Sequence, residues 1–170
     1  MNQTSLQHLA APLPPASPRI PRIAIIASSW HHDLVSRSTD AIRAEFARQF
    51  LPEDCATQFD VPGAFEIPLL AKRLARTDRY DAIIACALVV NGGIYRHEFV
   101  ASAVIDGLMR VQIDEDVPIF SAVLTPRDFH EHEAHQRFFR EHLVTKGTEV
   151  ARACLRTLEH LDALSMRKAA

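Results

Sequence analysis

Short runs of apolar residues alternate with segments of helical periodicity along most of this chain. The apolar runs are Ile23–Ala27, Thr57–Val61, Asp81–Val90 and Pro118–Leu124. Short apolar runs that are bounded by turn residues are typical of strands in a sheet whose two faces are both covered. The pattern therefore predicts four strands.

Each predicted strand is followed by a segment in which apolar residues recur every three or four positions, as on one face of a helix. In the last of these segments the inner stripe is Val150, Cys154, Leu158 and Leu161, and we expect Lys146–Gly147 to begin the helix. Strands that alternate with helices form a parallel sheet with helices on both faces, because crossovers between parallel strands are right-handed. The predicted fold class is α/β with a four-stranded parallel sheet.

The chain of 170 residues has the length of one ordinary domain. A proline-rich arm, residues 1–19, comes before the first strand and cannot form a helix or a central strand. This arm is either a free tail or an extended segment that adds to a neighbouring subunit. We assign residues 20–165 to the domain and residues 166–170 to a C-terminal tail.

Composition narrows the classes of function. Hydrophobic residues make up 48% of the chain, and the net charge of −2 gives no basic surface for nucleic acid or an anionic membrane. No stretch approaches ~20 continuous apolar residues, so we expect no membrane-spanning helix. The three cysteines have no motif spacing, and we expect Cys86 and Cys154 to be buried thiols in a protein of the reducing cytoplasm.

Ligands of parallel α/β sheets bind beyond the carboxyl ends of the strands. Four loops are predicted at this edge, namely Ser28–Trp30, Pro62–Glu66, Asn91–His97 and Thr125–His130. Together they offer an aromatic face, a polar turn, a glycine pair and several cations, which suits a planar polar ring beside a phosphorylated fragment. This combination favours an enzyme over a pure binding module.

Each of these features also has a purely structural explanation. Trp30 is either a packing residue or a flat face for a heterocycle. Glu66 suits the dipole at a helix start, or it accepts hydrogen bonds from a ligand. Gly92–Gly93 either makes a tight turn or lets a ligand approach the backbone, but the third glycine of a dinucleotide-binding motif is missing.

Residues 130–135 read HEHEAH, which invites comparison with metal-binding motifs. The helical zinc motif has two residues between the His-Glu pair and the second histidine, whereas this segment has a single residue there. We therefore expect a solvated helix face, or a histidine that binds an anion, and no metal site.

The same loops resemble those of one enzyme family, the 6,7-dimethyl-8-ribityllumazine synthases. The similar stretches are FDVPGAFEIPLLAKRLA (59–75), YDAIIACALVVNGGIYRHEFVA (80–101), VPIFSAVLT (117–125) and KG (146–147). The resemblance extends from residue 21 to about residue 160, and VPGAFEIP is highly specific. Trp30 and the segments GGIYRHEFV and LTPRDFHEHEAH are more similar to the second bacterial type of the family.

The resemblance implies a flavodoxin-like three-layer α/β/α sandwich that assembles into pentamers, with each active site between adjacent subunits. It implies the condensation of 5-amino-6-(D-ribitylamino)uracil with 3,4-dihydroxy-2-butanone 4-phosphate to 6,7-dimethyl-8-ribityllumazine, phosphate and water, the penultimate step of riboflavin biosynthesis. It implies neither a cofactor nor a metal. The long segment between Thr125 and Lys146 favours a decamer of two pentamers.

The resemblance also assigns site residues by position. Trp30 takes the place of an aromatic residue that stacks on the pyrimidine, and Gly93–Ile94 that of the turn around the butanone phosphate. Arg96 and His97 are the candidate catalytic residues. The candidate substrate-binding residues are Trp30, Ala64, Phe65, Glu66, Leu88, Val89, Val90, Gly93, Ile94, Ser121, His135 and Lys146.

Three positions depart from the common pattern of the family. Arg96 stands where most members have the catalytic histidine, Ser121 replaces an aromatic residue, and His135 replaces an arginine that holds phosphate. Arginine stays protonated at neutral pH, so it is a poor proton donor, but it can stabilise a departing phosphate. We expect Arg96→Ala to lower turnover more than His97→Ala. The alternative function is a flavin- or lumazine-binding protein with weak or no synthase turnover.

Overall fold

The computed structural model describes residues 19–92, 96–127, 129 and 132–169, with only the backbone described at residue 134 and residues 166–169. Its four strands form one parallel sheet of order β2-β1-β3-β4. The elements in chain order are β1 (Ile23–Ser28), α1 (His32–Arg48), a 3-10 turn (Glu53–Cys55), β2 (Ala56–Val61), a second 3-10 turn (Ala64–Glu66), α2 (Ile67–Ala75), β3 (Ala82–Leu88), α3 (His97–Glu115), β4 (Ile119–Leu124) and α4 (Glu133–Ala169).

The two most apolar strands occupy the middle of the sheet. Every residue of β1 and β3 is buried, whereas the edge strands β2 and β4 include exposed residues. A central strand is covered on both faces, which is why its sequence is an almost continuous apolar run. The four predicted strands are therefore confirmed, with small differences at their ends.

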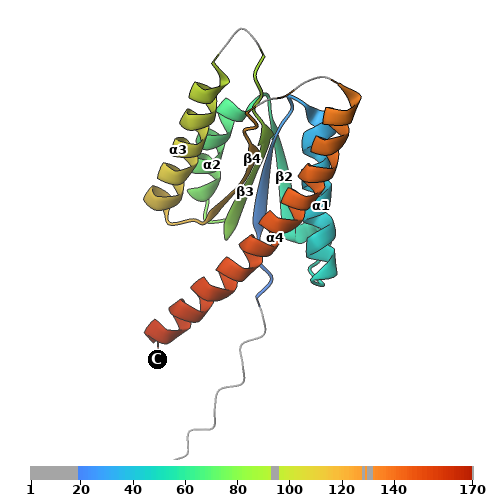
Figure 1. Ribbon diagram of the computed structural model, residues 1–170. Helices are drawn as coiled ribbons and strands as arrows, with labels where there is room; N and C mark the ends of the chain where they lie inside the picture. Colours follow the sequence, from blue (N-terminus) through green and yellow to red (C-terminus); the bar gives the residue numbers. More distant parts are fainter. Residues whose placement is uncertain (1–18, 93–95, 128, 130–131, 170) are drawn as a thin grey trace, which may run out of the picture.

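Two helices cover each face of the sheet, which gives a three-layer α/β/α sandwich of the flavodoxin-like type (Figure 1). Successive strand residues point to opposite faces. Ile25 and Ile84 pack on the face that α1 and α4 cover, and Ile26 and Ile83 pack on the face that α2 and α3 cover. The predicted fold class is confirmed.

The last helix differs from the prediction in two respects. It begins at Glu133, so Lys146–Gly147 lies inside it and not at its start. Gly147 is needed where α4 crosses α1, because a Cβ on this residue would overlap the carbonyl oxygen of Ser38. Leu161 of the predicted inner stripe is exposed, because the C-terminal half of α4 extends beyond the sheet (Figure 1).

The two ends of the chain are described in part. Residues 1–18 of the predicted arm lie outside the described residues, whereas Arg19 and Ile20 are described and exposed. α4 continues to Ala169, so it includes residues 166–169 of the segment that we assigned to a tail. Among the described helices, none combines the length and the apolar character needed to cross a bilayer.

Candidate active site

A cavity of about 440 Å³ lies at the carboxyl ends of β1, β2 and β3. Small-ligand sites commonly have volumes of ~300–1,000 Å³. The cavity lies where the strand order reverses, between β1 and β3, which is the usual ligand position in an open α/β sheet. The lining residues come from the three strand ends and from the first turns of α3: Trp30, His31, Gly63, Ala64, Phe65, Glu66, Leu88, Val89, Val90, Gly92, His97 and Val100.

Trp30 forms an exposed aromatic wall of this cavity. The residue is 71% exposed, although its backbone N–H donates a hydrogen bond to the Pro62 carbonyl oxygen at 3.2 Å. The indole lies over Gly63, where an added Cβ would be 3.4 Å from Trp30 Cε3. A tryptophan with an anchored backbone and an open ring suits stacking on a planar ligand better than core packing.

The turn from Gly63 to Glu66 presents polar groups beside this ring. Glu66 Oε2 accepts a hydrogen bond from the Gly63 N–H at 2.9 Å, which fixes the turn. Within the described part of the chain no hydrogen bond engages Oε1 of Glu66, so this oxygen is available to ligand hydroxyls or amides. Phe65 is exposed and adds a second aromatic ring to the wall.

The end of β3 supplies an apolar wall. Leu88 and Val89 are buried, Val90 is half-buried, and the Val89 N–H donates to the Leu124 carbonyl oxygen at 2.8 Å. Gly92 follows at an open position, where an added Cβ would have no neighbouring atom within 4 Å. The valines keep this side of the cavity apolar, and the glycine leaves the backbone accessible to a ligand.

His97 and Arg96 are neighbours that differ in their relation to the cavity. His97 is the first residue of α3, lines the cavity and has a side chain that is 12% exposed. Its Nδ1 lies 3.4 Å from Glu98 Oε2, a contact that can orient the imidazole. Arg96 is exposed and is not a lining residue, and its guanidinium lies 5.8 Å from the centre of the Phe99 ring. The single chain therefore presents His97 to the cavity.

Three further candidate residues lie away from this cavity in the single chain. Ser121 is exposed on the edge strand β4. His135 packs against Phe129, with ring centres 6.0 Å apart. Lys146 Nζ pairs with Glu149 Oε2 at 2.7 Å on the outer surface of α4. A site that used these three residues would need them from a second copy of the chain.

The cavity also includes residues that we had not assigned to it, namely His31, Gly63, Gly92 and Val100. The two glycines stand beside assigned residues, so the loop patterns contained a signal for them. His31 directly follows the predicted loop after β1, whereas Val100 belongs to the apolar pattern of a helix and looks like a core residue. The candidate residues Gly93–Ile94 lie outside the described residues.

The described residues contain neither a metal-binding cluster nor a reactive thiol. No group of three or more His, Cys, Asp or Glu residues among them is arranged to hold a metal ion, while His130 and Glu131 lie outside the described set. Cys86 and Cys154 are fully buried, and burial raises the pKa of each thiol to about 12. Both are core residues, as predicted, because a thiol with such a pKa stays protonated and unreactive.

Comparisons with known proteins point to one family. Residues 21–162 match the family model described as 6,7-dimethyl-8-ribityllumazine synthase. A 6,7-dimethyl-8-ribityllumazine synthase of Rhodococcus erythropolis is 57% identical over 143 residues, which cover 84% of this chain and 92% of the relative.

Two relatives with the name 6,7-dimethyl-8-ribityllumazine synthase 2 are similar over comparable lengths. The protein of Bradyrhizobium diazoefficiens is 52% identical over 149 residues, covering 88% of this chain and 89% of the relative. The protein of Pseudomonas syringae pv. tomato is 51% identical over 143 residues, covering 84% of each. The resemblance found in the sequence is therefore confirmed, and the chain belongs to the 6,7-dimethyl-8-ribityllumazine synthase family.

Proposed function

We propose that this protein is a lumazine synthase of riboflavin biosynthesis, which condenses 5-amino-6-(D-ribitylamino)uracil with 3,4-dihydroxy-2-butanone 4-phosphate. The products are 6,7-dimethyl-8-ribityllumazine, phosphate and water. The strongest support in the structure is the cavity itself, where an open tryptophan ring, a polar turn and a histidine meet at the carboxyl ends of the strands. Membership of the lumazine synthase family supports the same reaction.

The cavity offers complementary contacts for the pyrimidine substrate. We propose that the exposed indole of Trp30 stacks on the flat ring. Aromatic side chains stack on almost any planar heterocycle, and this stacking contributes favourable binding free energy. Glu66 Oε1 accepts hydrogen bonds from the ribityl chain or the ring amide, and Leu88–Val90 form the apolar wall opposite. These contacts hold the ring amine beside the start of α3.

The chemistry requires proton transfers and the departure of phosphate. The 5-amino group of the pyrimidine attacks the ketone of the second substrate, and one water is lost as an imine forms. Phosphate is then eliminated, and the ring closes when the ribitylamino nitrogen attacks the remaining carbonyl carbon with loss of a second water. His97, which lines the cavity, is proposed to move protons in these steps. Arg96 and the free N–H groups at the start of α3 are proposed to stabilise the departing phosphate. None of these steps calls for a cofactor or a metal ion.

An unpartnered apolar face on α3 supports an oligomer. Ile105, Met109 and Ile113 recur every four residues along α3 and are exposed, and Leu69 of α2 is exposed as well. Contiguous exposed apolar residues mark interaction surfaces. We propose that further copies cover this face in a pentamer, that two pentamers form a decamer, and that neighbouring subunits complete each site.

Cysteine usage supports a reducing compartment. Cys55, Cys86 and Cys154 are free and buried. Free buried thiols without disulfides are usual in cytoplasmic proteins. We therefore propose that the protein acts in the cytoplasm on small-molecule substrates, with neither nucleic acid nor membrane as a partner.

The function is tested by giving the purified protein both substrates. The expected result is the absorption band of the lumazine together with one phosphate released per lumazine formed. A reaction without protein corrects for the uncatalysed condensation. Absence of product above this background at high protein concentration would contradict the catalytic claim.

A parallel titration with riboflavin separates the synthase from the alternative binding protein. Tight flavin binding with quenched Trp30 emission, but without condensation, would favour a flavin- or lumazine-binding protein. Condensation at many turnovers per site identifies the synthase, whatever the flavin affinity is.

Assembly is tested by native mass spectrometry of the wild type and of Met109→Asp. We expect a decamer for the wild type and smaller species for the variant, because the new carboxylate would be buried without a partner in the interface. Thr145→Asp is a control, since Thr145 is an exposed polar residue of α4, which covers the other face of the sheet. A wild-type protein that is monomeric at micromolar concentration would contradict the proposed interface.

A further inference from the structure

His31 has a backbone conformation that residues with a Cβ rarely adopt. Its φ of 56° and ψ of 39° are left-handed, and it stands between Trp30 and the first residue of α1. Its carbonyl oxygen accepts hydrogen bonds from the N–H groups of Leu34 and Val35, each at 2.9 Å. An unfavourable conformation of this kind persists where surrounding contacts hold it, and such residues cluster at functional sites. His31 lines the cavity, so the contacts that hold it bear on the site.

A row of aromatic rings leads from α4 to His31. Phe129 lies edge-on against His31, with ring centres 5.5 Å apart and planes at 60°. Phe129 also packs on Phe139 of α4 at 5.3 Å and on His135 at 6.0 Å. Phe139 is buried in the core between α1 and α4. The rings therefore connect the rigid layer of α1 and α4 to the cavity wall.

Trp30 has supports on two sides. On one side its backbone N–H is bonded to Pro62 and its indole lies over Gly63. On the other side the chain continues directly into His31, whose ring meets Phe129. Moving His31 would rotate the peptide that joins it to Trp30, because the left-handed dihedral angles set the direction of the chain at this point.

We propose that Phe129, held by Phe139 and His135, is a positioning residue that fixes His31 and, through it, the plane of the Trp30 indole in the cavity. The inference rests on the proposed function, in which that indole stacks on the pyrimidine. It gives His135 a role in the ring row, which differs from the phosphate contact that the family pattern implies. Phe129 itself does not line the cavity.

Trp30 is the only tryptophan of the chain, so intrinsic tryptophan fluorescence reports on the cavity alone. The test compares Phe129→Ala with Phe129→Leu, which keeps an apolar contact, and with Phe138→Ala as a matched control. Phe138 packs on Phe139 and His142 but is not a neighbour of His31. Far-ultraviolet circular dichroism and size-exclusion chromatography confirm that each variant keeps the secondary structure and the assembly of the wild type.

In Phe129→Ala we expect altered Trp30 emission, easier quenching by acrylamide, and a KM for the pyrimidine that is raised about tenfold, as suits the loss of one aromatic pair. The kcat is expected to change less than about twofold, because a positioning residue does not touch the reacting atoms. Phe129→Leu should restore most of the wild-type KM, and Phe138→Ala should match the wild type in both readouts.

A double-mutant cycle with His31 completes the test. If Phe129 acts through His31, adding Phe129→Ala to His31→Ala should raise the KM no further. Unchanged Trp30 quenching and KM in Phe129→Ala, or additive effects in the double variant, would overturn the proposal. Should the wild type make no lumazine, the proposed function fails, and the fluorescence of Phe129→Ala against Phe138→Ala still decides whether Phe129 positions Trp30.

Discussion

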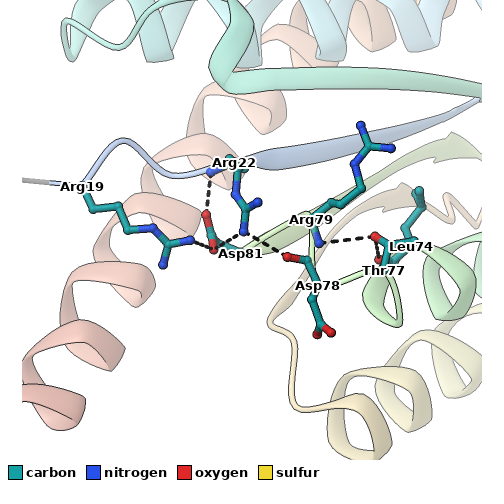
Figure 2. A network of polar contacts seen from close by, with 7 residues as sticks. All are labelled: Arg19, Arg22, Leu74, Thr77, Asp78, Arg79 and Asp81. Carbon is teal, nitrogen blue, oxygen red and sulfur yellow. Dashed lines mark hydrogen bonds and ion pairs between the residues drawn. The ribbon is translucent and has the colours of Figure 1, made fainter.

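The two ends of the sheet differ in whether their side chains are engaged with one another or open to a ligand. At the amino end, Asp81 accepts hydrogen bonds from the Arg19 guanidinium and from the Arg22 backbone, each at 2.7 Å, and Arg22 also donates to the Asp78 carbonyl oxygen (Figure 2). At the carboxyl end, the cavity has mainly apolar walls and leaves the ring of Trp30 open. Arg19, Arg22 and Asp81 pair with one another at the first end, whereas the indole of Trp30 stays open to a ligand at the second.

Cavity size alone would favour the end of the molecule opposite to the candidate site. The cavity beside the Arg19–Asp81 pair has a volume of about 720 Å³, compared with about 440 Å³ at the carboxyl end. Arg19 and Asp81 of its lining are already paired, and one of its walls is the half of α4 that extends beyond the sheet. We therefore assign the candidate site by the chemistry left available to a ligand and not by cavity volume.

The largest effect on turnover is expected for His97, at the carboxyl end of the sheet. We expect His97→Ala to lower turnover about 100-fold or more, the usual loss of a general acid–base group. We expect Arg96→Ala to lower it less, because Arg96 is not a lining residue of the cavity. The sequence alone predicted the opposite ranking. Steady-state kinetics of both variants decide, and a larger loss in Arg96→Ala would return the catalytic role to the arginine.

Trp30 and Phe50 are exposed aromatic residues at opposite ends of the sheet. We expect Trp30→Ala to weaken pyrimidine binding by about 1–3 kcal/mol, the usual contribution of stacking a base on an aromatic ring. Phe50→Ala should leave binding unchanged. Isothermal titration calorimetry measures both, and equal affinities in the two variants would remove the stacking role.

Glu45 of α1 stabilises the packing of α1 against α4. Its buried carboxylate is bonded to Arg152 of α4 and to Arg48, and the Arg152 hydrogen bond is the main reason that its pKa is lowered from 4.5 to about 2. A lowered pKa in the folded state means that this stabilisation is present above pH 4.5 and is lost as the pH falls toward about 2. We expect Glu45→Gln to lower the melting temperature at pH 7 and to approach the wild type near pH 2.

Thermal unfolding of Glu45→Gln between pH 7 and pH 2 checks this expectation. Glu149→Gln is the matched control, because Glu149 forms an exposed pair with Lys146 on α4, the helix that also carries Arg152. Exposed pairs contribute little to stability, so the control should melt close to the wild type at every pH. A gap between Glu45→Gln and the wild type that stayed constant down to pH 2 would rule out the ion pairs as its cause.

The smallest effect is expected for Asp81→Asn. Its partners Arg19 and Arg22 are largely exposed, and pairs of this kind contribute about 0–1 kcal/mol to the free energy of unfolding. Turnover and pyrimidine binding should stay at wild-type values, because the network lies at the end of the sheet opposite to the cavity. A marked loss of turnover in Asp81→Asn would mean that the two ends are coupled.

Much of the fold follows from the sequence because burial leaves a readable pattern. β1 and β3 are covered on both faces, so their apolar runs marked the centre of the sheet. The start of α4 was placed too late, although Phe139 and Leu143 continue its inner stripe toward the N-terminus and are buried. The polar segment around them obscured that signal. The prediction for Leu161 failed because helical periodicity cannot show where a helix leaves the sheet.

The lining of the cavity was predictable where residues directly follow a strand. Trp30, Ala64–Glu66 and Leu88–Val90 reach the cavity because parallel strands bring their carboxyl ends to one edge. Which of Arg96 and His97 lines the cavity depends on a backbone dihedral angle that the sequence does not specify. Arg96 is extended, with ψ of 92°, so it precedes α3, and the first helical residue lines the cavity instead.

The most direct test of the account is the fluorescence of Trp30 during titration with 5-amino-6-(D-ribitylamino)uracil. Stacking of this ring on Trp30, the only tryptophan of the chain, predicts saturable quenching whose midpoint agrees with the KM for the same substrate. Catalysis at saturating pyrimidine without any change in tryptophan emission would contradict it.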